Sequence, residues 1–204
     1  MLTSSPTMHD SRTALPVMWQ SRPITEFRTS PRIAERAPID DRVAEPRIVA
    51  LASMMLADEC AARGVRVDVA RVLRLALLHD LQETRTGDMP RTVAGYYGRG
   101  ARKAAERKAF DDIVRGAARA DAYSALHEDY EERASLEARL VKAADVIDLL
   151  AQALAFERAG SRGLDEFWEG AEARDFGLEG ASRDVVREVV AALVRAREEV
   201  SSKR

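Results

Sequence analysis

Apolar residues recur every three or four positions over most of the chain, which is the period of a helix with one buried face. Charged or glycine-containing stretches separate the segments that carry this period. The period predicts long helices over residues 40–63, 69–83, 101–117, 121–135, 136–159 and 182–200, with shorter pieces within 89–100 and 161–182. Because no stretch reads as a β-hairpin, the sequence predicts an all-α fold of about six to eight helices.

Residues that begin and end helices support these boundaries. Asp40 or Asp41 can cap the first helix and Asp68 the second, because a short carboxylate accepts hydrogen bonds from the free N–H groups of a first turn. Gly64 follows the first helix and Gly160 follows the long helix 136–159. Glycine is the usual residue just beyond a helix C-terminus, so both positions are predicted stops.

The first 38 residues differ from the rest of the chain. They contain five of the seven prolines, with Ser and Thr between them and no sustained apolar period. Proline interrupts helices, and a chain of 204 residues suffices for one main domain. We therefore expect an irregular arm over residues 1–38 and a single helical domain over residues 39–204.

Composition and charge exclude several classes of partner. The 32 basic and 34 acidic residues give a net charge of −2, which provides no global attraction for nucleic acid or an anionic membrane. The single cysteine, Cys60, fits a reducing compartment. The sequence shows neither a secretory signal nor an apolar run long enough to span a membrane. We expect a cytoplasmic protein that binds neither nucleic acid nor membrane.

Two predicted helices carry polar residues on their apolar side. His79 and Asp80 lie on or beside the stripe of helix 69–83, which is marked by Leu73, Ala76, Leu77 and Leu81. Asp145, Asp148 and Gln152 lie on the side of helix 136–159 that is marked by Val141, Ala144, Leu149 and Leu150. An ionised carboxylate on an apolar face is costly unless a cation or several donors compensate it.

These polar positions have two interpretations. His79 taken alone could be a neutral buried histidine, and each aspartate could pair with one of the many arginines. However, two helices that both direct carboxylates inward, together with an imidazole, also fit a site for one divalent cation. Such ions accept hard oxygen ligands together with a borderline nitrogen. The residues themselves leave both interpretations open.

The segment LQETRTGDMPRTV, residues 81–93, adds two carboxylates between these helices. Glu83 lies one helical turn beyond His79 on the same predicted face, and Asp88 follows a glycine in a predicted turn. Taken singly, they would be a solvated side chain at a helix end and an ordinary turn residue.

Three segments, DRVAEPRIVALA, ALLHDLQETRTGDMPRTV and EARLVKAADVIDLLAQALAFE, together resemble the HD-domain metal-dependent phosphohydrolases in order and spacing. The resemblance is strongest to the branch of 5'-deoxynucleotidases and covers about residues 28–160. Its specific part is His-Asp-x-x-Glu followed by Thr-Gly-Asp-x-Pro. The resemblance implies an HD-type helical bundle that hydrolyses nucleoside 5'-monophosphates.

The resemblance also implies roles for individual residues. His79, Asp80 and Asp145 match positions that bind the metal ion in the family. Glu83 matches the glutamate placed to act on the attacking water, and Asp88 matches the aspartate of the family's Thr-Gly-Asp. We therefore expect Glu83 and Asp88 to be catalytic.

The substrate phosphate is expected to meet basic side chains. Arg32 aligns with an arginine that the family uses against the phosphate, and Lys142 is a second candidate to neutralise it. The tryptophan that follows this arginine in the family is absent, and Glu35 stands near its place.

The chain departs from the family at Pro46. The family reads Val-Ala-Glu-His where this chain reads Val-Ala-Glu-Pro, so its first histidine ligand is missing. Proline is acceptable in a first helical turn, where we expect Pro46 to lie, but it offers no donor atom to a metal. The site then has one imidazole and two carboxylates, unless water or another side chain completes it: Glu45, Asp41, His127 or His9.

The first hypothesis is a hydrolase that holds one divalent ion, Mn, Co, Mg, Fe or Zn, and acts on a nucleotide or a related small phosphate ester. Its oligomeric state is left open, with a homodimer one option. The alternative is an HD fold impaired at Pro46 that binds nucleotides or acts as a regulatory module. A third hypothesis is a helical interaction protein without a small-molecule site.

Overall fold

The computed structural model describes residues 41–87, 96 and 98–202 of the chain. These residues form eight helices: α4 (Asp41–Ala62), α5 (Val69–Leu78), α6 (Glu83–Thr86), α8 (Arg99–Val114), α9 (Ala120–Glu132), α10 (Leu136–Arg158), α11 (Asp165–Trp168) and α12 (Gly180–Ser202). No strand occurs among the described residues, and the predicted all-α fold is confirmed. The predicted arm over residues 1–38 and most of the short piece within 89–100 lie outside the described residues.

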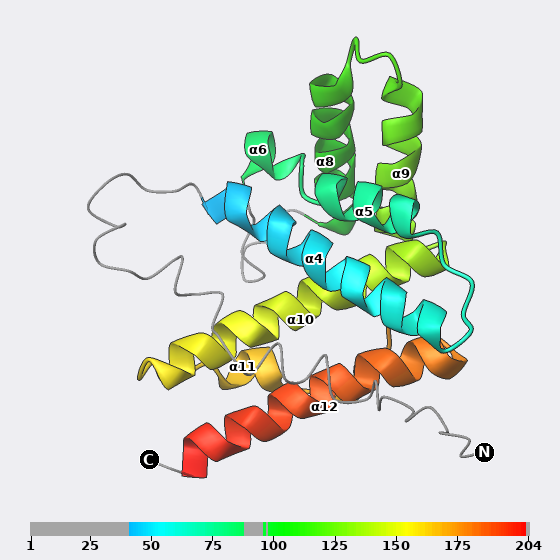
Figure 1. Ribbon diagram of the computed structural model, residues 1–204. Helices are drawn as coiled ribbons and strands as arrows, with labels where there is room; N and C mark the ends of the chain where they lie inside the picture. Colours follow the sequence, from blue (N-terminus) through cyan, green and yellow to red (C-terminus); the bar gives the residue numbers. More distant parts are fainter. Residues whose placement is uncertain (1–40, 88–95, 97, 203–204) are drawn as a thin grey trace, which may run out of the picture.

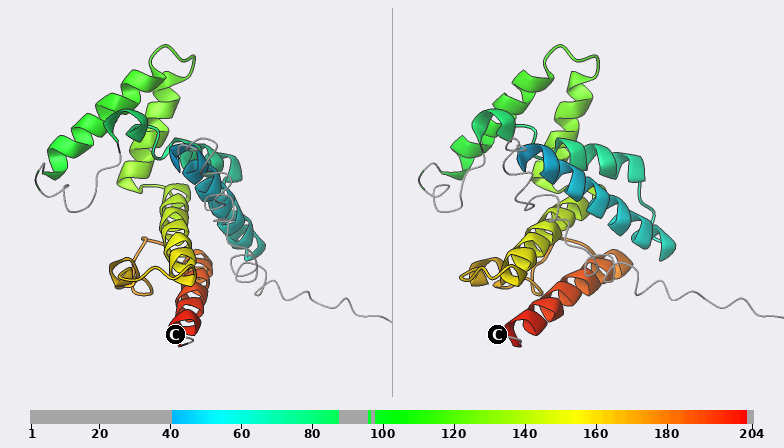
Figure 2. Two further views of the ribbon diagram at one scale, coloured as in Figure 1. Left: turned by 90° about the vertical axis from the view of Figure 1, so that its left-hand side faces the viewer. Right: turned by 60° about the vertical axis from the view of Figure 1, so that its left-hand side comes forward.

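Helix α10 is the centre of the fold. It lies between α4 and α12 and also contacts α5, α9 and α11 (Figure 1). Its buried residues lie on most sides of the helix, and many are alanines, which let neighbouring helices approach closely. Helices α8 and α9 pack on each other and project from this body (Figure 2). Residues on α10 are therefore held from several directions.

The second predicted helix is shorter than expected. We expected one helix over residues 69–83, but α5 ends at Leu78 and a separate short helix, α6, begins at Glu83. Between them, the N–H of Leu81 donates to the carbonyl of Leu78, and the N–H of Glu83 donates to that of Asp80. These bonds span three residues rather than four, so the chain tightens into turns and leaves the axis of α5.

Two leucines assigned to buried stripes are exposed. Leu77 of α5 is 56% exposed and Leu149 of α10 is 41% exposed. The buried face of α5 is instead formed by Val72, Leu75 and Ala76, and the line continues to His79. The predicted stripe of α5 was therefore wrong at Leu77, whereas the prediction that polar residues enter the core was correct for His79.

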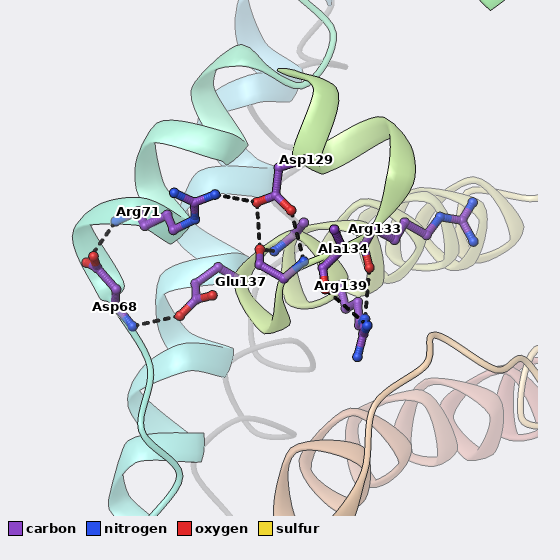
Figure 3. Close-up of polar contacts among 9 residues, drawn as sticks. Asp68, Arg71, Asp129, Arg133, Ala134, Glu137 and Arg139 are labelled. Atoms are coloured by element: carbon purple, nitrogen blue, oxygen red, sulfur yellow. Dashed lines mark hydrogen bonds and ion pairs between the residues drawn. The ribbon is translucent and has the colours of Figure 1, made fainter. Parts of the chain in front are cut away.

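A polar junction joins α5, α9 and α10 (Figure 3). The carboxylate of Asp129, at the end of α9, accepts hydrogen bonds from Arg71 Nη2 at 2.7 Å, and from the backbone N and the Oγ of Ser135 at 2.9 and 2.6 Å. Nearby, the backbone N of Asp68 donates to Glu137 Oε1 at 3.0 Å. The junction fixes the end of α9 and the start of α10 against the first turn of α5.

The Asp129→Ala variant should lose about 2–4 kcal/mol of unfolding free energy near pH 7, because it leaves Arg71 and the start of α10 without their acceptor. Although burial opposes ionisation, the hydrogen bonds from Ser135 and Arg71 hold the pKa of Asp129 below its ordinary value of 3.8. A carboxylate with a depressed native pKa stabilises the fold above its ordinary pKa, and this contribution disappears as the pH falls through the native value.

The measurement is urea unfolding of both proteins near pH 7 and at about pH 3. The difference in unfolding free energy between the two proteins should be smaller at the lower pH. The neighbouring Glu128→Ala variant is the control, since Glu128 forms an exposed ion pair with Arg107, and its loss should change stability by less than about 1 kcal/mol. An equal deficit of Asp129→Ala at both pH values would contradict the role of its charge.

None of the helices in the described ranges has the length and apolar character needed to cross a membrane.

Candidate metal centre

The structure brings together the three residues expected to bind a metal ion. His79 and Asp80 follow the last residue of α5, and Asp145 lies in the middle of α10. One potential ligand atom from each of the three lies within 4.8 Å of the other two. This is the only such group of three or more His, Cys, Asp or Glu side chains within the described residues. Residues 65 positions apart in the sequence thus share one site.

The ring of His79 presents an unprotonated nitrogen to the site when it is neutral. Nδ1 lies 2.8 Å from the carbonyl oxygen of Ala76, which can only accept, so Nδ1 carries the proton. Nε2 then has a lone pair, is buried without a well-aligned hydrogen-bond partner, and lies 2.9 Å from Asp80 Oδ2. Two acceptors at this distance repel each other unless a proton or a cation lies between them.

The charges around His79 favour a positive group at this point. Burial opposes a charged imidazole, but the carboxylates of Asp80 and Asp145 outweigh it and raise the pKa of His79. The same electrostatic attraction would act on a divalent ion bound to Nε2 and the two carboxylates. The donor set of one imidazole and two carboxylates therefore fits a divalent cation.

Asp145 is held by two side chains besides any ion. Its Oδ2 accepts a hydrogen bond from Lys142 Nζ at 2.6 Å and lies 3.4 Å from the hydroxyl of Tyr130. Burial, together with Asp145 and Asp80, raises the pKa of Tyr130 well above its ordinary value, so this hydroxyl stays protonated. Lys142, predicted to face the phosphate, thus lies directly beside the candidate metal ligands.

Two polar residues of α10 lie outside the group. The side chain of Asp148 is nearly buried, and its Oδ2 accepts a hydrogen bond from Gln152 Nε2 at 2.6 Å. Both were predicted to lie on the same stripe as Asp145, and the structure joins them to each other and not to the candidate metal ligands.

Glu83 begins the turn of helix that follows the His-Asp pair. Its backbone N–H donates to the carbonyl of Asp80 at 3.0 Å, and its side chain is half-buried. Its carboxylate also contributes, after that of Glu106, to the raised pKa of Arg102 on α8. The tight turn after α5 therefore holds the backbone of Glu83 against that of Asp80, one of the candidate ligands. Asp88 and Arg32 lie outside the described residues.

His127 does not complete the site. It is buried in α9 and stacks on Phe110 of α8, with ring centroids 4.2 Å apart. Burial lowers the pKa of its imidazole. His127 is therefore part of the packing between α8 and α9, and the suggestion that it replaces the missing ligand finds no support here. His9 lies outside the described residues.

Pro46 lies farther into its helix than we expected. Helix α4 begins at Asp41, so Pro46 is its sixth residue rather than part of its first turn. Since proline has no N–H, the carbonyl of Arg42 lacks its usual donor within the helix. The departure from the family therefore also costs backbone hydrogen bonding.

Tyr130 is a residue of the site that the sequence did not predict. The segment 121–135 was predicted only as an amphipathic helix, and nothing in its period distinguishes Tyr130 from a core aromatic. The available signal was chemical, because a buried tyrosine usually needs a partner for its hydroxyl. In the structure that hydroxyl faces a candidate metal ligand.

Comparisons with known proteins agree with this fold. The family model for the HD domain matches residues 47–173, which include the three candidate ligands. The structure is similar to that of a conserved hypothetical protein from Pyrococcus furiosus, with a TM-score of 0.63 and 33% identity over 75% of this chain and 82% of that one. It is also similar to the crystal structure of a protein from Pyrococcus horikoshii OT3, with a TM-score of 0.63 and 30% identity over 74% of this chain and 81% of that one. No curated protein matches the sequence.

The chain belongs to the HD-domain family. HD domains generally bind divalent metal ions and belong to a superfamily of metal-dependent phosphohydrolases. The side chains found at the C-terminal end of α5 and in α10 suit such an ion.

Proposed function

We propose that this chain is a divalent-metal-dependent phosphomonoesterase that acts on nucleoside 5'-monophosphates or related small phosphomonoesters. The observation that carries the proposal is the lone pair of His79 Nε2 facing the carboxylate of Asp80, with Asp145 beside them. This arrangement suits a divalent cation in place of a proton on Nε2, and the resemblance of the surrounding segments to the 5'-deoxynucleotidases supports the substrate class.

The proposed site uses His79, Asp80 and Asp145 to hold the ion. When bound, a divalent ion polarises a phosphate ester and lowers the pKa of a coordinated water. Glu83 accepts the proton of the attacking water, as the resemblance implies for this position. Because the protein supplies one nitrogen and two carboxylates, it should favour hard ions such as Mg²⁺ or Mn²⁺ over Zn²⁺.

Basic side chains bind the phosphate and neutralise its charge in this proposal. Lys142 is well placed, because its Nζ already lies beside a candidate ligand carboxylate. Arg32 is assigned to the phosphate and Asp88 to catalysis by the resemblance alone. The alternative, an HD fold that binds a nucleotide without hydrolysing it, is favoured by Pro46, which removes one imidazole from the site.

The proposal is tested with a panel of phosphomonoesters and several divalent ions, assayed on the unmodified chain after removal of bound metal. Release of phosphate from nucleoside monophosphates that depends on an added ion would support it. Binding of a nucleotide with no hydrolysis under any ion would favour the regulatory alternative.

Position 46 supplies a separate prediction. Pro46→His should raise the affinity for Mn²⁺ and Zn²⁺ by at least about tenfold, because a histidine there restores the nitrogen ligand of the family. Zn²⁺ should gain more than Mn²⁺, since it prefers nitrogen to oxygen ligands. Metal titration by calorimetry measures both affinities, and the phosphomonoester panel measures the accompanying gain in turnover.

Pro46→Ala is the matched control. Both substitutions return the missing N–H to α4, but only histidine offers a metal ligand. Equal affinities in the two variants would show that relief of the proline, and not the imidazole, causes any change. Unaltered affinity in Pro46→His, with full activity of the unmodified chain, would show that another group already completes the site.

A further inference from the structure

Tyr130 touches two of the three candidate metal ligands although it is not a ligand itself. It lies near the C-terminal end of α9, is 6% exposed, and forms part of the hydrophobic core. Its ring faces His79 and its hydroxyl faces Asp145. A tyrosine needed only for packing would not have to contact both His79 and Asp145.

The ring of Tyr130 restricts the ring of His79. The two ring centroids lie 5.5 Å apart and the planes meet at 72°, an edge-on contact. The hydrogen bond from Nδ1 to Ala76 fixes one side of the imidazole, and the aromatic ring packs against it from another helix. Together they keep Nε2 directed at Asp80, which is the orientation that a metal ligand needs.

The hydroxyl of Tyr130 restricts the carboxylate of Asp145. It lies 3.4 Å from Oδ2, the same oxygen that accepts the shorter bond from Lys142. Neither of these two groups bonds Oδ1. The pair therefore fixes the orientation of the carboxylate of Asp145 through one of its two oxygens.

The position of Tyr130 is itself fixed by the polar junction. Asp129, the preceding residue, accepts hydrogen bonds from Arg71 of α5 and from Ser135 at the start of α10. These are the two helices that carry or precede the candidate ligands. The end of α9 is thus tied to both of them at the point where Tyr130 enters the core.

We propose that Tyr130 is the positioning residue of the metal centre, orienting His79 with its ring and Asp145 with its hydroxyl. The inference rests on the proposed function, because it assumes that these side chains bind an ion. The two parts of the side chain have different roles, because the hydroxyl acts on Asp145 and the ring acts on His79.

Two variants test these parts in the full chain. Tyr130→Phe keeps the ring, so the affinity for Mn²⁺ should fall only about 3- to 10-fold, as expected for one weak hydrogen bond. Tyr130→Leu loses both contacts, so the affinity should fall about 10- to 100-fold. Tyr123→Phe, on the same helix and outside the metal group, is the matched control and should bind Mn²⁺ like the unmodified chain.

A second measurement does not require metal. Nitrogen-15 NMR of the metal-free proteins, recorded at a pH where the imidazole of His79 is neutral, reports which of its ring nitrogens carries the proton. The unmodified chain and Tyr130→Phe should show the Nδ1–H form, whereas Tyr130→Leu should show exchange between forms because its imidazole can rotate. Thermal unfolding accompanies each measurement, and Tyr130→Phe, which keeps the core ring, should unfold close to the unmodified chain.

The outcomes separate the two proposals. Failure of the unmodified chain to bind Mn²⁺ or any other divalent ion overturns both, because Tyr130 then positions no metal ligand. Binding by the unmodified chain, with equal affinity in both Tyr130 variants and an unchanged His79 ring, overturns only the role of Tyr130. A loss of stability with no change in metal affinity or ring state would likewise assign Tyr130 to packing alone.

Discussion

The Asp145→Asn variant is expected to bind Mn²⁺ at least about a hundredfold more weakly than the unmodified chain, and to lose metal-dependent hydrolysis in parallel. Asparagine has nearly the same shape as aspartate, so α10 should stay folded. It lacks the negative charge that attracts the ion, and its amide can no longer balance Lys142. Loss of a group that merely supports a ligand costs about 10- to 100-fold, so loss of a ligand charge should cost at least as much.

Asp58→Asn serves as the control, because Asp58 is an exposed carboxylate of α4 outside the metal group. Calorimetric titration after chelation gives the affinities, and circular dichroism checks the helical content. Retention of full affinity by Asp145→Asn would mean that α10 contributes no ligand, and the convergence of the three side chains would then be a structural ion-pair network around Lys142.

The Glu83→Gln variant should reduce the turnover of nucleoside monophosphates by about a hundredfold or more while leaving metal affinity nearly unchanged. Glutamine keeps the size of the side chain but cannot accept the proton of the attacking water. The two effects should separate because Glu83 begins α6, beyond the turn of residues 79–82, and is not one of the three clustered side chains.

The assay compares kcat, KM and metal affinity for Glu83→Gln and for Glu166→Gln, an exposed glutamate of α11. A drop in kcat confined to the first variant supports the role in proton transfer. A parallel drop in metal affinity would instead make Glu83 a ligand, and unaltered kcat would move the proton acceptor elsewhere, with Asp88 the next residue to test.

Helix periodicity was enough to predict the long helices but not the end of α5. Residues 69–83 keep an apolar period through Leu81, so nothing in their spacing marks a stop at Leu78. The stop depends on hydrogen bonds at three-residue spacing and on a side-chain bond from His79 to the carbonyl of Ala76. Such bonds depend on the packing of the folded chain, which a periodic pattern does not encode.

The candidate ligands stood out in the sequence because each placed a charged or titratable group on an apolar face, and the resemblance to the HD-domain family assigned them to a metal ion. Asp148 of the same predicted stripe is also buried, but it accepts a hydrogen bond from Gln152 four residues along the helix and lies outside the metal group. The pattern also could not find Tyr130, whose role depends on the relative placement of α9 and α10. Pairings between distant helices are set by the tertiary fold, and a single sequence does not show them.

The end of α5 at the metal centre has a consequence for the order in which ligands bind. The last carbonyls of a helix carry a partial negative charge, and here they lie beside Asp80, with Asp145 close to both. Without an ion, these acidic groups oppose the approach of a phosphate dianion. On the proposed function, the divalent ion should therefore bind before the ester, because it reverses the charge that these groups create.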